Sequence, residues 1–458
     1  MDPVLIIISD LHVGANDDFD IFRSDDKPRL FADFLTHVAS RGSPVELVIN
    51  GDFVDFLQLR PWNDLSRAAA LGKIRQIVQG SVHVFADLGQ FLRDPRHQLK
   101  VLLGNHDVEL GYPEVWAEAR QAILARAPDA AGRLEFFNTR TTYNPRVNGV
   151  TVHVEHGNAG DLWNEINYVP LFQDVETGTK TFAYPPGTKL VYETMNGFKE
   201  SYRFVDLLKP EMPAVPLTLL ALEPSTALSA LPYIARQTLK SWANGLIAGL
   251  RRRLGGMAFP APGSISVEHA TEEAMAGCYA RRGVAQSDLK EIEAFLSQQG
   301  PAMPPTVSFT PSSGNSIKLR LLVSALLTLN RFRAAQQGET FYAANHRDNT
   351  TARYAHQNWL KGDVKVVVFG HTHEALTATF PEGVYINGGA WANLVKLPSG
   401  ADPSSLVNWF QGIADNTFER TSFPTFVRVA SEGGGVSVGL NAWTETGERR
   451  LWGGSICP

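Results

Sequence analysis

Short apolar runs alternate with longer amphipathic stretches in the first third of the chain. The runs at residues 4–9, 46–50 and 100–103 are rich in leucine and β-branched residues and end in polar residues or glycine, a pattern typical of buried strands. Residues 29–40 and 73–93 have a helical pattern, and residues 150–155 form a further apolar run. Because strands alternate with helices, we predict an α/β sheet core.

The strand pattern returns near the other end of the chain, at residues 364–369, 384–387, 425–430 and 435–439. From about residue 166 to 355 it fades, and prolines separate three amphipathic segments at 234–254, 287–298 and 318–333. We therefore predict three parts: the first half of a core at residues 1–165, a mainly helical insertion at 166–355, and the second half of the core at 356–458.

Composition narrows the class of protein only a little. Of the 458 residues, 44% are hydrophobic and 19% are charged, as in ordinary globular chains, and the formal net charge of -5 argues against a protein that coats nucleic acid. The two cysteines, Cys278 and Cys457, exclude a disulfide framework and a thiolate-rich metal site. The apolar run at the N-terminus stops at Asp10, which is too early for a signal peptide. These features predict a cytoplasmic protein without a nucleic-acid partner.

Candidate chemistry follows five of the predicted strands. Ligand sites of α/β sheets gather at the carboxyl ends of strands. Carboxylate, amide and imidazole ligands without thiolate suit a hard or borderline divalent metal ion such as Mn, Fe or Zn. The side chains in these turns are Asp10 and His12, Asp52 and Asp55, Asn105, His106 and Asp107, His156, and finally His371 and His373.

The spacing of residues within these turns explains how two side chains of one turn could reach the same site. In D-x-H and H-x-H, residues two apart on an extended chain point to the same side, so both reach one cluster. The glycines before Asp52, Asn105 and His371 permit tight turns that bring the backbone close to the site. We therefore expect an extended backbone at the ligands and close packing at the glycines.

The ordered set D-x-H, G-D-x-x-D, G-N-H-[DE], H and G-H-x-H resembles the calcineurin-like metallophosphoesterase family. The resemblance covers residues 4–160 and 364–393. It implies an α/β fold of the metallophosphoesterase type, an αββα sandwich in which two packed mixed β-sheets are flanked by helices. It also implies that one metal is held by Asp10, His12, Asp52 and His373, and the other by Asp52, Asn105, His156 and His371.

In this resemblance Asp52 bridges the two metals, His106 stands near the leaving group, and Asp55 orients His106. Asp107 is expected only to support these residues. Two cations about 3.5–4 Å apart would bind the phosphoryl oxygens and activate a bridging hydroxide that attacks phosphorus in line. The sequence therefore predicts a metal-dependent phosphoric ester hydrolase acting on a phosphate ester or pyrophosphate. The substrate is left open among a nucleotide, a small phosphorylated metabolite and a lipid phosphate.

Two further segments are candidates for substrate contact. The stretch after His156 resembles an H-G-N-x-x-D-x-x-N segment found in some members of the family, which would bring Asn158, Asp161 and Asn164 to the site; a capped helix start is the alternative. The stretch after the H-x-H loop contains Asn387 and Trp391, which either touch substrate or form a structural turn.

The sequence leaves alternatives open for residues 234–254, for the insertion and for the function. Residues 234–254 are basic and amphipathic, so they form either a peripheral membrane contact or a helix packed on the core or on a second subunit. The insertion is placed to act as a lid or as a wall of the pocket. A non-catalytic binding or scaffold protein on the same fold, or a nuclease of the same family, are the competing functions.

Overall fold

The computed structural model describes most of the chain outside its middle third. The described residues are 3–138 except 25 and 63, 142–161, 164–166, 342–396 and 420–456, with short stretches between 184 and 209 and residues 412, 416 and 417. The chain divides into two compact units, and the first comprises Met1–Leu208, Gln337–Lys396 and Phe418–Pro458. All that follows concerns this first unit, since nearly all of the second lies outside the described residues.

One seven-stranded sheet has the order β17-β16-β15-β1-β2-β3-β4. Its strands β1 (Val4–Ile8), β2 (Val45–Asn50), β3 (Gln98–Leu102) and β4 (Leu134–Phe137) are parallel. The strands β15 (Thr425–Glu432), β16 (Gly435–Thr444) and β17 (Gly447–Ile456) continue it in antiparallel pairs. In register, Ile6 of β1 lies opposite Leu47 of β2 and Arg428 of β15. Strand β1 therefore joins segments from both ends of the chain.

The second sheet runs β5-β7-β10-β12-β11-β9, with β6 paired to β7. Strands β7 (Val150–Glu155), β10 (Val364–Phe369) and β12 (Gly383–Gly388) are parallel, and β11 (Ala375–Phe380) is antiparallel to β12. The short strands β5 (Thr142–Tyr143), β6 (Arg146–Val147) and β9 (Tyr342–Ala343) lie outside them. This sheet also pairs a strand from before the predicted insertion with strands from after it.

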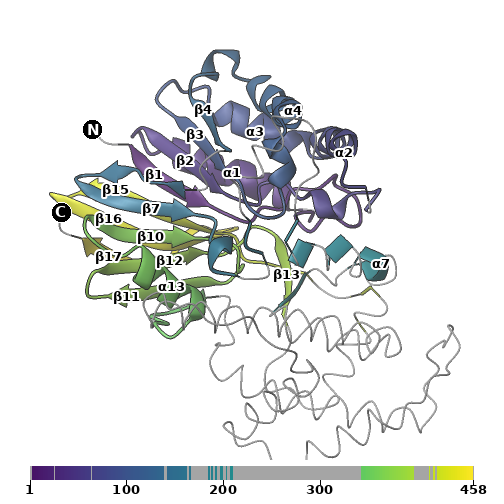
Figure 1. The fold of residues 1–458 in the computed structure, drawn as a ribbon. Coiled ribbons are helices and arrows are strands. Elements are labelled where there is room, and N and C mark those ends of the chain that lie inside the picture. Colours follow the sequence, from purple (N-terminus) through teal and green to yellow (C-terminus); the bar gives the residue numbers. More distant parts are fainter. Residues whose placement is uncertain are drawn as a thin grey trace, which may run out of the picture. The chain divides into compact units, whose positions relative to one another are not determined.

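The two sheets pack face to face with helices on their outer faces (Figure 1). Alternate residues of each strand meet between the sheets, for example Leu5 and Ile7 of β1 with Val152 and Val366. The other face of the first sheet packs against α1 (Lys27–Ala39), α2 (Arg67–Gly80), α3 (Val82–Phe91) and α4 (Pro113–Leu124). Helix α13 (Thr350–Asn358) covers the outer face of the second sheet. The predicted αββα sandwich with two mixed sheets is confirmed.

Shorter elements complete the described part. The 3-10 turns are η1 (Phe56–Gln58), η2 (Val108–Gly111), η3 (Pro128–Ala130) and η4 (Asn158–Gly160). The remaining elements are α7 (Asn196–Lys199), β8 (Leu208–Lys209), β13 (Asn393–Lys396) and β14 (Thr421–Ser422). Turns η1, η2 and η4 follow the motif loops after β2, β3 and β7, so they fix the chain where it leaves those loops.

The single helix expected over residues 73–93 is wrong, because the chain forms α2 and α3 instead. Helix α2 ends at Gly80, where an added Cβ would lie 2.0 Å from the carbonyl oxygen of Ala15. The Ser81 hydroxyl donates to the carbonyl oxygen of Gly14, 2.8 Å away, and α3 begins at Val82. Packing against the loop after β1 therefore breaks the helical pattern.

Several other expectations lie outside the described residues. They include the three helical segments at 234–254, 287–298 and 318–333, and with them the membrane-contact reading of residues 234–254. The predicted boundaries of the insertion at 166 and 355 stay a prediction. In the part of the chain that the structure describes, no helix combines the length and the apolar character needed to cross a bilayer.

Candidate metal centre

Five loops converge where the parallel strands of both sheets end. The loop after β1 is tied to the loop after β2 by the backbone N–H of His12, which donates to the Asp52 carbonyl oxygen at 2.9 Å. In the second sheet, the N–H of Gly370 after β10 donates to the carbonyl oxygen of His156 after β7 at 2.8 Å. Because parallel strands end at the same edge of a sheet, the motif residues reach one region.

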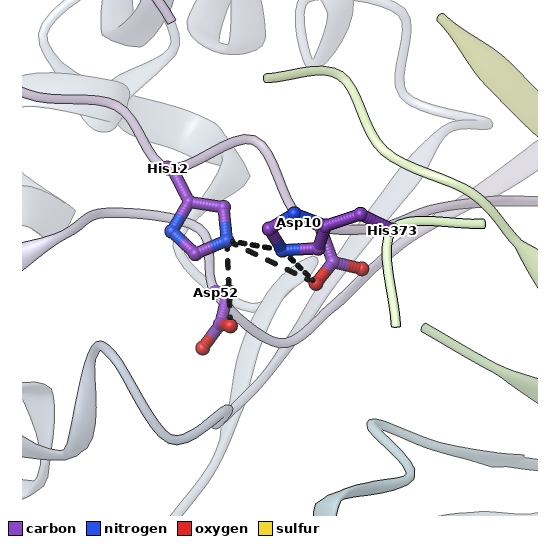
Figure 2. A group of neighbouring side chains, drawn as sticks. All are labelled: Asp10, His12, Asp52 and His373. Carbon is purple, nitrogen blue, oxygen red and sulfur yellow. Dashed lines mark hydrogen bonds and ion pairs between the residues drawn. The ribbon is translucent and has the colours of Figure 1, made fainter. Parts of the chain in front are cut away.

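Asp10, His12, Asp52 and His373 form one tight group (Figure 2). Each offers a ligand atom, and these atoms all lie within 4.8 Å of one another. The Nε2 atoms of His12 and His373 are 2.9 Å apart, and His373 Nε2 is 3.2 Å from Asp10 Oδ1. Nitrogen and carboxylate oxygen atoms that face a common point, three of the four residues being buried, fit a divalent cation.

A second group adjoins the first through Asp52. The Oδ2 atom of Asp52 lies 3.5 Å from His12 Nε2 and 3.2 Å from His156 Nε2. Asn105 Oδ1 is 3.1 Å from the same His156 nitrogen, while His156 Nδ1 donates to the Asn50 carbonyl oxygen at 2.9 Å. Because Nδ1 is engaged by this bond, Nε2 is the ring nitrogen that faces Asp52. A second cation held by this group stays a prediction.

The fourth residue expected at the second metal, His371, is placed less directly. Its ring centroid lies 5.3 Å from that of His156, and its backbone N–H donates to Asp10 Oδ2 at 3.0 Å. Its Nε2 lies 3.0 Å from Asp161 Oδ2. The structure thus brings all seven predicted ligands to one region, while their division between two metals stays a prediction.

His106 and Asp55 lie beside this group. Asp55 Oδ2 is 3.0 Å from His106 Nδ1 and 2.9 Å from His12 Nδ1, so one carboxylate holds two imidazoles. The His106 side chain is 26% exposed, whereas the side chains of His12 and Asp55 are buried. His106 is therefore the imidazole of this group best placed to meet a bound molecule, and Asp55 fixes its ring orientation.

Burial and neighbouring imidazoles shift the pKa values of the carboxylates in the cluster. Burial opposes ionisation of Asp10, but the hydrogen bond and charge of His373 outweigh it and lower the pKa of Asp10 to about 2. Burial likewise opposes ionisation of Asp52 and Asp55, yet the neighbouring imidazoles, His156 for Asp52 and His106 for Asp55, hold both pKa values well below the ordinary range. Three ionised carboxylates gathered in the protein interior are the charge that divalent cations would neutralise.

Asp107 supports the loops that carry the site. It is buried, its Oδ1 accepts from the Gly104 N–H at 2.7 Å, and its Oδ2 accepts from the Phe53 N–H at 2.8 Å. Burial and the nearby charge of Asp52 raise the pKa of Asp107 to about 8. Asp107 therefore ties the G-N-H-D loop to the G-D-x-x-D loop.

The backbone at the ligands is left-handed, so the extended geometry expected for D-x-H and H-x-H is wrong. The φ angles are 53° for Asp10, 51° for His12, 50° for Asp52, 71° for His371 and 58° for His373. Side chains with a Cβ rarely adopt this region, although Asp and His do so more often than most. Such strain persists where surrounding contacts enforce it, and it concentrates at functional sites.

The glycines before the ligands are required by close approach, which confirms the expectation for Gly51, Gly104 and Gly370. A Cβ on Gly51 would lie 2.4 Å from His156 Nδ1, and one on Gly104 would lie 2.1 Å from Asp52 Oδ1. A Cβ on Gly370 would lie 2.4 Å from Asp10 Oδ2. Each glycine thus makes room for a predicted ligand from a different loop.

The segment after His156 reaches the site through Asp161. Asp161 Oδ2 accepts from Asn164 Nδ2 at 2.8 Å in addition to its contact with His371. Asn158 is buried and its Nδ2 donates to the Asn164 carbonyl oxygen at 2.9 Å. Asn158 and Asn164 therefore hold the turn that positions Asp161, and a role of the three in substrate binding stays a prediction.

Asn387 and Trp391 have structural surroundings. Asn387 Nδ2 donates to the Gly370 carbonyl oxygen at 2.6 Å, so it braces the loop that carries His371. The Trp391 side chain is fully buried, packs on Phe31 and Phe34 of α1, and donates from Nε1 to the Thr425 carbonyl oxygen. The structure does not bring the Trp391 ring to the site, because the apolar face of α1 takes it up; only its backbone N–H meets the Asp10 loop.

The sequence patterns do not reveal three buried charged residues, of which Glu109 and Lys73 interact electrostatically with Asp55. Glu109 in η2 is 3% exposed, and its Oε1 accepts from the Tyr184 hydroxyl at 2.8 Å. Lys73 of α2 and Lys199 of α7 are each 2% exposed and lie within electrostatic reach of each other. No motif marks these residues, but Lys73 occupies the buried face of an amphipathic helix beside Ala70, Ile74 and Ile77, and a charge at such a position was the available signal.

Glu109 makes the stability of the protein depend on pH. Burial raises the pKa of Glu109 to about 7 from an ordinary value of 4.5. A carboxyl whose folded-state pKa is raised contributes stability that is complete below the unfolded pKa and is lost as the pH rises through the folded pKa. Glu109→Gln keeps an acceptor for Tyr184 and removes the charge. We therefore expect the stability of the variant relative to the wild type to increase by about 1–3 kcal/mol when the pH is raised from about 5 to about 8.

Urea unfolding of both proteins at the two pH values measures this gain. Glu118→Gln on α4 is the control, because Glu118 forms a surface ion pair with Arg75. A stability difference between Glu109→Gln and the wild type that does not change with pH would mean that Glu109 is not buried as a neutral acid.

Comparison with models of known protein families gives a match over part of the chain. Residues 3–197 match the family model described as calcineurin-like phosphoesterase. The expected resemblance is therefore confirmed over these residues, and the family that they match implies hydrolase activity. No curated protein matches the chain in a sequence search.

Proposed function

We propose that the chain is a dinuclear metal-dependent phosphoesterase that hydrolyses a phosphate ester or pyrophosphate. The observation that carries this proposal is the position of Asp52, whose Oδ2 atom lies within 3.5 Å of an imidazole from each of the two expected metal sets. A carboxylate shared in this way is what a bridging ligand requires. The family match supports the same class of reaction.

Some residues of the cluster would hold metal ions, and others would transfer a proton. Divalent cations at this cluster would polarise the phosphoryl oxygens and lower the pKa of water. Asp10, Asp52, Asn105 and the four imidazoles of the ligand set would hold them. Asp55 accepts from His106 Nδ1, which favours the protonated imidazole and directs the Nε2 proton away from Asp55. His106 would give this proton to the departing oxygen.

The substrate belongs to the proposal as a class only. A nucleotide, a small phosphorylated metabolite and a lipid phosphate all present the phosphoryl group that this cluster fits. The competing function, a binding or scaffold protein on the same fold, would be expected to have lost ligand residues. All seven predicted ligands are present and converge, so we favour the enzyme.

Metal analysis together with an aryl phosphate assay tests the proposed function. We expect purified protein to bind about two equivalents of Mn, Fe or Zn, and chelation to remove the metal and the activity together. Restoring manganese, iron or zinc singly should recover activity and show which ions the site accepts. Protein that binds no added metal and hydrolyses neither aryl phosphate nor a diester analogue would overturn the proposal in favour of the scaffold.

A further inference from the structure

The imidazole of His371 is held at two points. Its backbone N–H donates to Asp10 Oδ2 at 3.0 Å, and its ring Nε2 lies 3.0 Å from Asp161 Oδ2. The side chain is 9% exposed, and its ring meets the ring of His156 edge to face, with the centroids 5.3 Å apart. The backbone and the neighbouring ring therefore leave His371 little freedom, and Asp161 engages one of its two ring nitrogens.

The carboxylate of Asp161 is itself fixed by its own turn. Asn164 Nδ2 donates to the same Asp161 Oδ2 at 2.8 Å, and the Asn164 N–H donates to the Asp161 carbonyl oxygen at 3.0 Å. The buried Asn158 holds Asn164 through a hydrogen bond of 2.9 Å from its Nδ2 to the Asn164 carbonyl oxygen. This turn follows directly after His156, so the segment that supplies one imidazole of the second group also orients the other.

The hydrogen bond to Asp161 decides which nitrogen of His371 can serve a cation. An imidazole that binds a metal gives the lone pair of one nitrogen and keeps a proton on the other. An ionised carboxylate only accepts hydrogen bonds, so the nitrogen that faces Asp161, Nε2, is the one that keeps the proton, and Nδ1 is left to bind. His156 has the reverse arrangement, because its Nδ1 is engaged by the Asn50 carbonyl oxygen and its Nε2 lies 3.2 Å from Asp52 Oδ2.

We propose that Asp161 is a positioning residue for His371: it accepts from Nε2 and thereby directs Nδ1 to the cation of the Asp52–His156 group. The inference rests on the proposed function, because it assigns the ligand atom of a residue expected at the second metal. Asp161 acts through His371 and not by touching the substrate. The two side-chain contacts that its Oδ2 already makes, with Asn164 and with His371, support this role.

Nitrogen NMR of the full chain, loaded with zinc and carrying isotope-labelled histidine, reads the position of the proton. The signals of His371 are those missing from His371→Gln. In the wild type we expect a zinc-bound Nδ1 and a protonated Nε2. In Asp161→Asn we expect this pattern to be lost, because an amide can either donate or accept and so does not fix the proton on Nε2. A zinc-bound Nε2 in the wild type, or the wild-type pattern in Asp161→Asn, would overturn the proposal.

Metal titration gives a second readout. Asp161→Asn should weaken the binding of the second zinc equivalent about 10- to 100-fold, the usual effect of changing the hydrogen-bond partner of a metal-binding histidine, and should change the first by less than about 3-fold. Glu382→Gln is the matched control, because it removes a carboxylate that lies 2.9 Å from His356 Nε2 in an exposed pair; it should leave both affinities unchanged. An unchanged second affinity in Asp161→Asn contradicts the positioning role.

Kinetics separate positioning from substrate contact. At saturating zinc, Asp161→Asn should keep KM for an aryl phosphate within about 3-fold of the wild type, while more zinc is needed for half of the maximal rate. A raised KM together with wild-type zinc affinity would mean that Asp161 contacts the substrate, and the proposal would fall.

Asn164→Ala covers the case in which Asp161→Asn does not fold. It leaves the carboxylate in place and removes the Nδ2 donor that holds it. The second zinc equivalent should then bind about 3- to 10-fold more weakly, the effect of losing one ordinary hydrogen bond. Unchanged zinc binding in Asn164→Ala would in that case overturn the proposal.

The two proposals fail in different ways. Zinc-loaded protein in which Asp161 fixes His371 as described, but which hydrolyses no phosphate ester with any metal, would contradict the proposed function and leave the positioning role standing. Hydrolysis together with wild-type zinc binding in Asp161→Asn would overturn the positioning role alone. Wild-type protein that binds a single zinc equivalent would overturn the positioning role and the dinuclear form of the proposed function together.

Discussion

Asp52→Asn is expected to cause the largest loss of function of any single substitution in this protein. The change keeps the shape of the side chain and removes the charge from a carboxylate that lies within 3.5 Å of an imidazole from each group of predicted ligands. Changing an outer partner of a metal site typically costs about 10- to 100-fold, so loss of a shared ligand should exceed about 100-fold in activity and should lower the metal content of the protein.

Metal content by elemental analysis and aryl phosphate hydrolysis measure this effect. Asp33→Asn makes the same chemical change on the exposed face of α1 and should alter neither quantity. Circular dichroism shows whether the variant is folded. An Asp52→Asn protein that retains two metal equivalents and near-normal turnover would show that Asp52 does not bridge.

Gly51→Ala should damage both stability and the metal centre. At a φ of +79° an alanine is strained by about 1–2 kcal/mol, and its Cβ would overlap the ring of His156. His156 would have to leave the Asn50 carbonyl oxygen and the Asp52 carboxylate. We expect unfolding to become easier by more than about 2 kcal/mol and metal binding to weaken, as measured by thermal unfolding and by metal titration.

Gly42→Ala separates backbone strain from the clash. Gly42 has a φ of +76°, and an added Cβ would meet nothing within 4 Å. It should therefore cost only the strain of the left-handed backbone, about 1 kcal/mol, and leave metal binding intact. If Gly42→Ala and Gly51→Ala lost equal stability and bound metal equally, crowding of His156 would not be the reason for the glycine at position 51.

The strands that carry the site could be predicted because they are buried on both faces. Residues 150–155 and 364–369 form β7 and β10 at their predicted bounds, since continuous Val-rich runs are what a strand between two layers requires. Strands β1, β2 and β3 differ from prediction by one or two residues at their ends. The order of polar turns after these strands then located the cluster.

Other strands gave no clear local signal. In β11 the polar residue Thr377 interrupts the apolar sequence pattern, although its side chain is fully buried. Its hydroxyl lies 3.1 Å from the Tyr342 hydroxyl, so the burial of Thr377 depends on a residue outside the strand. Strand β17 is an edge strand, and its Arg449 and Arg450 are exposed. Charged residues protect an edge strand from pairing with another chain. They also interrupt the hydrophobic pattern by which a strand is predicted.

The backbone conformation of the site could not be predicted from the spacing of the motif residues. The left-handed backbone at Asp10 and His373 results from contacts between loops, and the D-x-H and H-x-H motifs do not predict it. The burial of Trp391 likewise depends on α1, which lies more than 300 residues earlier. Local sequence indicates which side chains are chemically able to act, while their directions are set by partners that are distant in sequence.

The pairing of β7 with β10 has a consequence for biosynthesis. His371 is translated about 215 residues after His156, which at ordinary elongation speeds takes roughly 10–40 s. During that interval a growing polypeptide has only part of the chelating set and lacks its last two imidazoles. Ribosome-bound fragments would thus lack the complete set of proposed ligands, which would assemble only once the late strands had joined the early ones.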